Sequence, residues 1–360
     1  MEVPEKLALV ADWFNGSLSY VDATKLATAT TREQLVTSTV DLKAYPPGPV
    51  DVAVTPDGKT ALVSSSTSFF AIPAAGFLIG VNNIPTGPGQ LLMLDVASGK
   101  VTAKLEGGPG PMAIQITPDS KRAVAVNFGS GMLGTADSSL VVIDLEKKQV
   151  TDTIPAGMFA EELAFDETGT VAIYGFGDAG SFRTFGVADP RNTQSAEIKL
   201  EGDSAGVAFF PGTKIAFGVQ APAVTALLTG GDAKGGYTII DVADPKLPKV
   251  LEDVRLDESP IGYPVVPAKN RNSVLVPTTV NSRLVLREYK LENNKAVLAG
   301  SIDIGEASLL SALGAAYDGD HTAVLAWPGK KALVVVDLTA KTSRLIDWLP
   351  EAGPADVTFR

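Results

Sequence analysis

The sequence has no cysteine and a single histidine, His321. The absence of cysteine excludes disulfide bonds, thiolate nucleophiles and cysteine-ligated zinc sites. With one histidine, a metal site built from several imidazoles is excluded as well, and a Ser-His-Asp mechanism could run only through His321. Any other catalysis would have to depend on carboxylates, Lys, Tyr, Arg or an oxygen-bound metal ion.

Positive charge and long apolar runs are also scarce. The 30 Lys and Arg residues face 41 Asp and Glu residues, a net charge of -11, so we expect no nucleic-acid partner. The uncharged stretch 61–94 contains a dense apolar part, 69–81, which is too short for a bilayer span and holds Pro73 and Gly76. We therefore expect no transmembrane segment. Residues 1–6 lack the pattern of a signal peptide, so none is expected within this chain.

An internal repeat runs through the chain. One element is an alternating strand that closes on a turn, as in 51–58 (DVAVTPDG) and 113–120 (AIQITPDS). The other is an apolar strand that ends in an acid and opens a turn. Seven copies with a mean period of about 52 residues, each providing four short strands, predict an all-β fold, a seven-bladed β-propeller. The copies of the second element centre on Asp22, Asp95, Asp144, Asp241, Glu288 and Asp337, with Gly186 in the fourth place.

The two ends of the chain complement each other. The chain finishes on a copy of the first element, 355–359, and begins on a second strand, 7–11. We therefore expect velcro closure, in which the C-terminal strand completes the sheet of the N-terminal strands and leaves no unpaired edge. One domain, 1–360, is predicted. Its blades are 350–360 together with 5–42, then 44–106, 107–155, 156–200, 201–256, 257–304 and 305–349.

The repeat units resemble those of a known family. Units 48–59 (GPVDVAVTPDGK) and 92–100 (LMLDVASGK), with 141–144 (VVID) and 334–337 (VVVD), are similar to the YVTN family of seven-bladed propellers. The resemblance covers essentially the whole chain and is strongest in the second, third and seventh blades. That family and its neighbours include surface-layer-associated and periplasmic binding proteins and lactonase-like enzymes. The resemblance thus implies the fold and a periplasmic or secreted protein, with a cytoplasmic location left open, but it names no activity.

The two faces of a propeller differ in the loops that they carry. The top face carries the loops between blades and between second and third strands, and the bottom face carries the turns after first and third strands. Sorted this way, acids gather in the top loops, whereas Lys and Arg gather in the bottom turns. An acidic top face would attract a cation or a basic ligand. We interpret His321 and five acids of the repeat as turn residues of the bottom face, where the acids cap backbone amides. These acids are Asp57, Asp95, Asp144, Asp241 and Asp337.

Three long insertions on the top face, 67–89, 128–138 and 221–236, are rich in apolar residues. We expect them either to cover the mouth of the central tunnel as a lid or to pack on one another. Under a lid, a pocket with apolar walls and converging carboxylates would suit a small molecule. The predicted pocket-lining residues are Trp13, Phe14, Phe69, Phe70, Met112, Phe159, Phe176 and Tyr263.

Two functions stay open at this point. The first is a binding propeller that holds a small molecule or a protein at an acidic, apolar-lidded top face. The second is an enzyme, hydrolytic and lactonase-like or isomerising. No cofactor is certain, Ca²⁺ or another divalent cation is left open, and a monomer is assumed. The candidates for metal ligands or a general base are Glu161, Glu162, Asp51 and Asp356, with Arg183 as an electrophilic partner.

Overall fold

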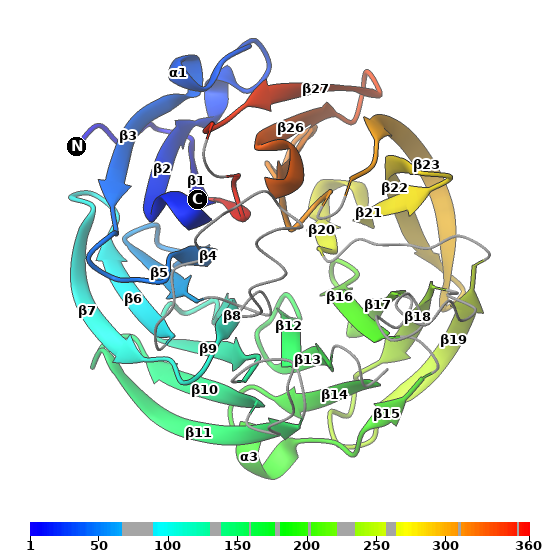
Figure 1. Cartoon of the computed structure of the whole chain (residues 1–360). Helices are drawn as coiled ribbons and strands as arrows, with labels where there is room; N and C mark the ends of the chain where they lie inside the picture. The colour runs from blue at the N-terminus through cyan, green and yellow to red at the C-terminus, as the bar shows by residue number, and fades with distance from the viewer. Residues whose placement is uncertain are drawn as a thin grey trace, which may run out of the picture. The chain divides into compact units, whose positions relative to one another are not determined.

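A computed structural model describes residues 1–66, 89–129, 138–157, 160–176, 181–200, 203–221, 235–256, 264–308, 311–350 and 353–360. The described residues form seven four-stranded sheets (Figure 1). The chain is a seven-bladed β-propeller, as the repeat predicts. In the described residues, no helix is long and apolar enough to cross a membrane.

Contacts divide the chain into two compact units. The four-sheet unit comprises Met1–Ala156 and Leu309–Arg360, and the three-sheet unit comprises Gly157–Ser308. Each sheet is numbered below by its place in the repeat, and its strands are given in order from first to fourth.

In the four-sheet unit, the first three sheets and the seventh are complete. Sheet 1 contains β28 (Asp356–Phe359), β1 (Leu7–Asp12), β2 (Ser17–Asp22) and β3 (Val36–Asp41). Sheet 2 contains β4 (Pro49–Val54), β5 (Thr60–Ser65), β6 (Gln90–Asp95) and β7 (Lys100–Glu106). Sheet 3 contains β8 (Pro111–Ile116), β9 (Arg122–Asn127), β10 (Ser138–Asp144) and β11 (Gln149–Gly157). Sheet 7 contains β24 (Gly314–Tyr317), β25 (Thr322–Trp327), β26 (Ala332–Asp337) and β27 (Thr342–Asp347). The short helices are η1 (Trp13–Asn15), η2 (Ala23–Lys25), α1 (Arg32–Leu35) and η5 (Pro328–Lys330).

The three-sheet unit holds the other three sheets. Sheet 4 contains β12 (Ala160–Phe165), β13 (Val171–Phe176), β14 (Ser181–Gly186) and β15 (Ile198–Lys199). Sheet 5 contains β16 (Asp203–Phe209), β17 (Ile215–Ala221), β18 (Gly236–Asp241) and β19 (Lys249–Arg255). Sheet 6 contains β20 (Val266–Ala268), β21 (Ser273–Val280), β22 (Arg283–Glu292) and β23 (Lys295–Glu306). Its short helices are α3 (Pro190–Thr193) and η4 (Lys269–Arg271).

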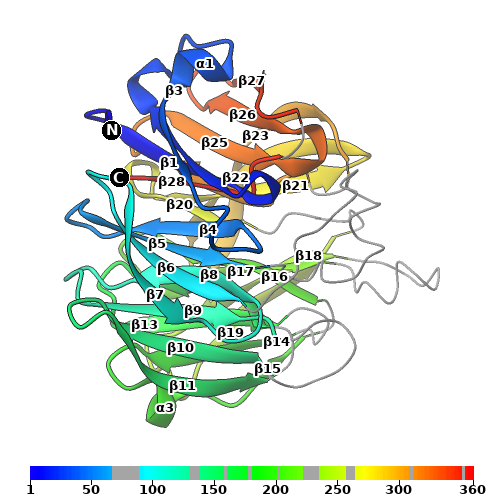
Figure 2. The ribbon, with the colours of Figure 1, turned by 60° about the vertical axis from the view of Figure 1, so that its left-hand side comes forward.

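Sheet 1 is built from both ends of the chain. The C-terminal strand β28 pairs antiparallel with β1, from Ala8 opposite Phe359 to Ala11 opposite Asp356 (Figure 2). Backbone bonds outside the strands extend this pairing: the Ala355 N–H donates to the Ala11 carbonyl and the Arg360 N–H to the Leu7 carbonyl. The last strand therefore supplies the first strand of the first sheet.

The core lies between neighbouring sheets. Second and third strands such as β5 and β26 are buried on both faces, because each sheet packs against a sheet on either side. Fourth strands such as β7 alternate between exposed and half-buried residues, because they form the outer edge of their sheets. One apolar cluster joins sheets 1 and 2, a second joins sheets 2 and 3, and a third joins sheets 7 and 1. In the three-sheet unit, comparable clusters join sheets 4 and 5 and sheets 5 and 6.

Each sheet has two different ends. We call the end where second strands lead into third strands the loop end, and the opposite end the turn end. At the turn end, the repeat acids accept backbone N–H groups as predicted: Asp57 from Lys59, Asp95 from Ser98, Asp144 from Lys147, Asp241 from Ala243, and Asp337 from Thr339 and Ala340. Hydrogen bonds hold the pKa of four of these acids below its usual range. The largest contribution comes from the Thr55 hydroxyl for Asp57 and the Ser98 hydroxyl for Asp95, and from the backbone N–H groups of Lys147 for Asp144 and Ala340 for Asp337.

Two lysines of the turn end pair with repeat acids. Lys59 lies 3.7 Å from Asp57, and Lys147 lies 2.9 Å from Asp144. In these two turns, the repeat acid therefore pairs with a lysine as well as capping the backbone.

Candidate ligand site at the loop end of the sheets

Buried polar side chains gather at the loop end. Along β5 the sequence changes from apolar Ala61, Leu62 and Val63 to Ser64 and Ser65, all of them buried. Buried polar groups are normally hydrogen-bonded because an unpaired one loses its bonds to water and gains nothing in return. A polar layer at one end of several sheets therefore indicates where polar contacts are made. In the four-sheet unit these residues are Asp12, Ser17, Ser64, Ser65, Ser66, Gln90, Asn127, Ser138 and Ser139, and in the three-sheet unit they are Ser181, Ser204, Gln220 and Thr278.

Two members of this layer face the contact between sheets 2 and 3. Ser64 lies two residues beyond Leu62, and Asn127 lies two residues beyond Ala125; Leu62 and Ala125 belong to the cluster that joins these sheets. Because alternate residues of a strand share a face, Ser64 and Asn127 point into the same layer. The Asn127 Nδ2 donates to Ser139 Oγ at 3.0 Å. The Ser64 Oγ and the Asn127 Oδ1 have no hydrogen-bond partner among the described residues.

A glycine-rich connection crosses this layer. It runs from Gly107 to Pro111 and joins sheet 2 to sheet 3. Gly108 has φ +76°, and a Cβ at this position would lie 2.3 Å from Asn127 Nδ2. Glycine is required here for its left-handed backbone and for its close approach to the amide. The connection thus holds the Asn127 side chain in place. Among the described residues, Asn127 Oδ1 still has no hydrogen-bond donor.

Gln90 anchors the preceding connection. Its Nε2 donates to the Pro46 carbonyl at 2.6 Å, and Ser65, opposite it in the ladder, donates to the Tyr45 carbonyl at 2.7 Å. The Gly48 N–H donates in turn to Ser65 Oγ at 3.0 Å. The Gln90 Oε1 is buried and has no partner in the described part of the chain. Sheets 2 and 3 together therefore present three buried oxygen atoms with unused hydrogen-bonding capacity.

The first strands of four sheets begin with an irregularity at the same end. The ladder shifts register between Pro49 and Asp51, between Pro111 and Ile114, between Ala160 and Leu163, and between Ser204 and Val207. Such bulges redirect side chains and backbone groups at the ends of strands. In sheet 2 the extra residue is Val50, and Asp51 follows it.

Asp51 and Asp356, two of the predicted site residues, are brought together. The Val52 N–H donates to Asp356 Oδ2 at 3.1 Å, and the Ile114 N–H donates to Asp51 Oδ2 at 2.8 Å. The two carboxyl groups also hydrogen-bond to each other, and burial raises the pKa of Asp356 to about 6. Each acid therefore links its own first strand to the first strand of the next sheet.

Glu161, Glu162 and Arg183 lie in the three-sheet unit. Glu161 is buried and Glu162 half-buried at the bulge of β12. Arg183 lies in the middle of β14, opposite Tyr174, with its Nη2 3.9 Å from the Glu197 carboxylate. Arg183 thus pairs with Glu197 from β14, the third strand of sheet 4, whereas Glu161 and Glu162 lie at the start of β12, the first strand of the same sheet.

The predicted pocket-lining residues are only partly described. Trp13 is buried, and its indole N–H donates to the Ser66 carbonyl at 2.9 Å, directly before the 67–89 insertion. Met112 is half-buried at the bulge of β8. The side chains of Phe14 and Phe176 lie outside the described part, although their backbones belong to η1 and β13. Outside the described residues lie Phe69, Phe70, Phe159 and Tyr263, together with 67–88, 130–137 and 222–234 of the three insertions.

The sequence analysis missed one buried acid, Asp12, at the loop end of sheet 1. Its Oδ2 accepts from Ser19 Oγ at 2.6 Å and Ser17 Oγ at 3.0 Å, and its Oδ1 accepts from Trp348 Nε1 at 2.5 Å. Burial raises the pKa of Asp12. Arg32 lies over the Trp348 ring, 5.1 Å from its centroid. Asp12 ends an apolar strand much as the repeat acids do, so its position alone did not distinguish it from a turn acid.

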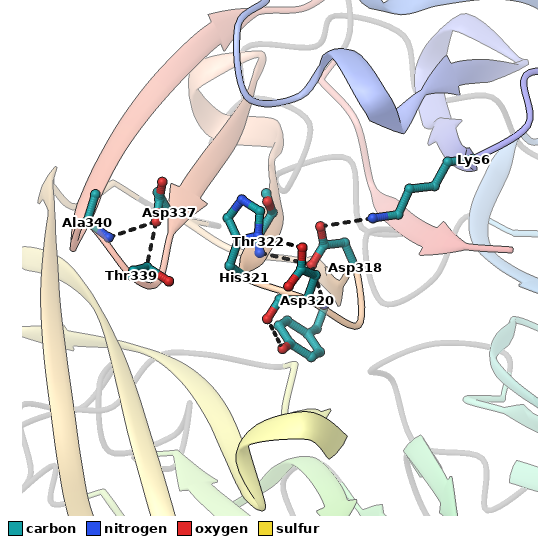
Figure 3. A network of polar contacts seen from close by, with 9 residues as sticks. Lys6, Asp318, Asp320, His321, Thr322, Asp337, Thr339 and Ala340 are labelled. Atoms are coloured by element: carbon teal, nitrogen blue, oxygen red, sulfur yellow. Dashed lines mark hydrogen bonds and ion pairs between the residues drawn. The ribbon is translucent and has the colours of Figure 1, made fainter.

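His321 lies at the turn end, in the turn between β24 and β25, as predicted. Its Nδ1 is 2.8 Å from Asp320 Oδ2, while nearby Asp318 accepts from the Asp320 and Thr322 amides and pairs with Lys6 at 3.4 Å (Figure 3). The hydrogen bond with Asp320 raises the pKa of the imidazole, and neighbouring carboxylates add to the effect. Within the described ranges, no group of three or more His, Asp or Glu side chains is arranged to hold a metal ion.

Comparison with known proteins supports the fold alone. No protein-family model matches the sequence, and no curated protein matches it significantly. A functionally unknown protein from Desulfotomaculum acetoxidans DSM 771 has a similar structure, with a TM-score of 0.71, 16% identity and 98% coverage of both chains. Kuenenia stuttgartiensis hydrazine synthase gives a TM-score of 0.61 at 15% identity, covering 92% of this chain and 89% of that chain. The Myceliophteria thermophila Cps50 (Swd1) β-propeller domain gives 0.59 at 9% identity, covering 83% and 86%. Membership of the YVTN family stays a prediction.

Proposed function

We propose that this chain is a binding propeller that holds a small molecule or a protein at the loop end of its sheets. The observation that supports this most is a set of buried acceptors in sheets 2 and 3 that have no hydrogen-bond partner among the described residues: Ser64 Oγ, Gln90 Oε1 and Asn127 Oδ1. A buried oxygen without a partner is unfavourable for the free protein. A ligand that donates hydrogen bonds to these atoms would relieve that penalty.

The acceptors also define the class of ligand. Two of them are amide carbonyl oxygens, and the nearby Asp51 and Asp356 are acids, so the ligand should carry hydroxyl or amino groups rather than a carboxylate or phosphate. In the sequence, the apolar insertions 67–89, 128–138 and 221–236 follow second strands of the repeat. The proposal includes their role as a lid. A periplasmic or secreted location belongs to the same proposal, and cell fractionation of the producing organism would test it.

The experiment compares Ser64→Ala with Ser98→Ala by thermal shift. The probes are glucose, myo-inositol, arginine and putrescine, with succinate and phosphate as anionic controls. At least one donor-rich probe should raise the Tm of the unmodified protein, and Ser64→Ala should reduce that rise. Ser64→Ala alone should be as stable as the unmodified chain or more so, because the hydroxyl it removes has no partner in the part of the chain that the structure describes.

Ser98 is the matched control because its hydroxyl donates to Asp95 in a turn at the opposite end of sheet 2. Its replacement should leave any probe-induced shift intact. The proposal fails if no donor-rich probe changes the Tm, or if Ser64→Ala and the unmodified protein respond alike.

The contact between Asp51 and Asp356 favours a second candidate, a hydrolase or isomerase that uses carboxyl groups as acid and base. Two carboxyls that share a proton can divide these roles between them. A metal-dependent version finds no ligand cluster among the described residues. The test is hydrolysis of γ-butyrolactone by the unmodified chain, Asp51→Asn and Asp356→Asn. Hydrolysis that both variants abolish supports this candidate, whereas absence of hydrolysis or equal rates in all three proteins rejects it for lactones.

A further inference from the structure

The three acceptors of sheets 2 and 3 are closed to a ligand in this conformation. Ser64 Oγ, Gln90 Oε1 and Asn127 Oδ1 are buried and have no hydrogen-bond partner among the described residues. A hydrogen bond needs a donor within about 3.2 Å of its acceptor. A ligand that donates to these atoms, as the proposed function requires, can therefore reach one of them only after a covering element moves.

The glycine-rich connection between sheets 2 and 3 covers Asn127. A Cβ on Gly108 would lie 2.3 Å from Asn127 Nδ2 and 3.6 Å from Asn127 Oδ1, so the backbone of Gly108 lies against the whole amide. A Cβ on Gly107 would lie 3.1 Å from Leu91 Cγ, and Leu91 is opposite Ser64 in the ladder of sheet 2. The connection thus occupies the position from which a donor would approach Asn127 Oδ1.

Two backbone hydrogen bonds hold the middle of this connection. The Phe128 N–H donates to the Gly110 carbonyl at 2.8 Å, and the Gly129 N–H donates to the Pro109 carbonyl at 2.9 Å. Three of the five residues of the connection are glycines, which have no side chain to pack against the core. A segment with few packed side chains opens at a lower cost in free energy than a core strand does.

The preceding connection, residues 42–48, is anchored more firmly. Its Leu42 and Tyr45 pack in the apolar cluster that joins sheets 1 and 2. Two side-chain donors also bind its carbonyls, at 2.6 and 2.7 Å. Opening it would expose apolar surface as well as break these bonds. The glycine-rich connection is therefore the easier of the two to open, and Asn127 rather than Gln90 becomes reachable.

We propose, building on the proposed function, that the glycine-rich connection is a movable cover over Asn127, and that a hydroxyl or amino group of the ligand takes its place and donates to Asn127 Oδ1. Gly108 and Gly110 have φ values of +76° and +71°. Glycine adopts positive and negative φ about equally well, so rotation at these two residues can move the cover. Asn127 Nδ2 already donates to Ser139, and the ligand completes the hydrogen bonding of the amide.

Amide exchange measures the opening without a ligand. The Phe128 and Gly129 amides donate to the cover itself, so each opening exposes both of them to exchange. In the unmodified chain their protection, corrected for intrinsic exchange, should be at least about 100-fold lower than that of the reference amide, Val124 in the middle of β9. Equal protection at the three amides would overturn the proposal.

Gly108→Ala tests whether the cover is the element that moves. The added methyl group would lie 2.3 Å from Asn127 Nδ2, so it should displace the cover and lower the protection of both amides, relative to the reference amide, at least about tenfold. Gly212→Ala is the matched control, because Gly212 has a similar φ of +69° and no atom lies within 4 Å of the added Cβ. It should leave both amides unchanged. Equal effects of the two variants would contradict the proposal.

The ligand readout uses the probes of the thermal-shift test: glucose, myo-inositol, arginine and putrescine. A probe that raises the Tm should lower the protection of the Phe128 and Gly129 amides, because it displaces the cover that carries their acceptors. If such a probe leaves both amides as protected as before, the proposed function stands and the movable cover is wrong.

If no donor-rich probe raises the Tm, the proposed function fails, and the binding step at Asn127 fails with it. The exchange of the unmodified chain then still decides whether the cover opens. If Gly108→Ala does not fold, the comparison of the Phe128 and Gly129 amides with the reference amide, with and without the probe, decides both points in the unmodified chain.

Discussion

At the scale of single residues, buried polar atoms divide into those that the fold satisfies and those that it leaves unused. Asp12 has no exposed surface and accepts three hydrogen bonds, two from Ser17 and Ser19 and one from Trp348. Tyr20, on the same sheet, has a buried hydroxyl without a partner in the described residues. Atoms of the first kind should stabilise the fold. Removal of an atom of the second kind should cost little or no stability.

This contrast predicts different effects for two similar substitutions. Trp348→Phe keeps an aromatic ring but removes the donor to Asp12 Oδ1, so it should lower the free energy of unfolding by about 1–3 kcal/mol. Tyr20→Phe removes a hydroxyl that has no partner within the described ranges, so it should be neutral or slightly stabilising. Urea denaturation measures both. If both variants lost the same free energy of unfolding, the hydrogen bond from the Trp348 indole N–H to Asp12 would not contribute to stability.

The single histidine gives a pH prediction at the same scale. Its raised pKa comes first from the hydrogen bond with Asp320, with Asp318 and Asp337 adding attraction (Figure 3). A raised folded-state pKa contributes stability below the ordinary value of about 6.5, and this contribution disappears as the pH rises through the folded value. The Tm of His321→Gln should thus fall below that of the unmodified chain at pH 5.5 and equal it at pH 9. A difference that is the same at both pH values would contradict this.

At the scale of elements, the strands and turns follow from local sequence, whereas the contacts between sheets do not. Pro-Asp-Gly turns and acids after apolar strands predict the sheets because one short side chain caps each turn. The sequence also singles out Asp51 and Asp356, because the repeat places both among the acids of the top face. Their contact depends on the Val50 bulge and on the spacing of sheets 1 and 2, which no local pattern encodes.

The insertion 23–35 shows how one element can fasten another. It connects β2 to β3, yet its Leu26 and Leu35 pack in the cluster that contains Ile346 of β27. Arg344 of β27 donates from Nε to the Ala29 carbonyl at 3.1 Å and from Nη1 to the Ala27 carbonyl at 3.0 Å. The insertion therefore holds the fourth strand of sheet 7 against sheet 1.

Replacing Arg344 tests this fastening. Arg344→Lys retains the charge but cannot reach two carbonyls with a planar fork, so we expect a loss of about 1–3 kcal/mol in unfolding free energy. Arg283→Lys is the control, because the side chains of Arg283 and its partner Asp303 are about half exposed, at 52% and 53% respectively. Because such an exposed pair contributes little to stability, Arg283→Lys should change the unfolding free energy far less than Arg344→Lys. Similar losses in both variants would show that Arg344 acts only as a surface charge.

At the scale of the whole molecule, the two ends of the chain share one sheet. The four residues of β28 pair with β1, and Val357 packs in the cluster that joins sheets 7 and 1. Without β28, the β1 edge would be unpaired and Asp51 would lose its carboxyl partner. Strands that pair with their neighbours in the sequence can therefore form without the C-terminus. Sheet 1, however, would lack its first strand.

Removal of residues 355–360 should thus cause a large loss that a peptide can reverse. The deletion removes the strand bonds of β28 and the buried side chain of Val357, together worth about 5 kcal/mol or more. A synthetic peptide of residues 353–360, added in excess, should bind in the vacated position and raise the Tm in proportion to the logarithm of its concentration. The same peptide with Val357→Asp should not, because it would place a charge in the apolar cluster. If the shortened chain does not fold alone, refolding it with each peptide gives the same comparison. Recovery with both peptides, or with neither, would show that β28 is not held by the specific packing described for sheet 1.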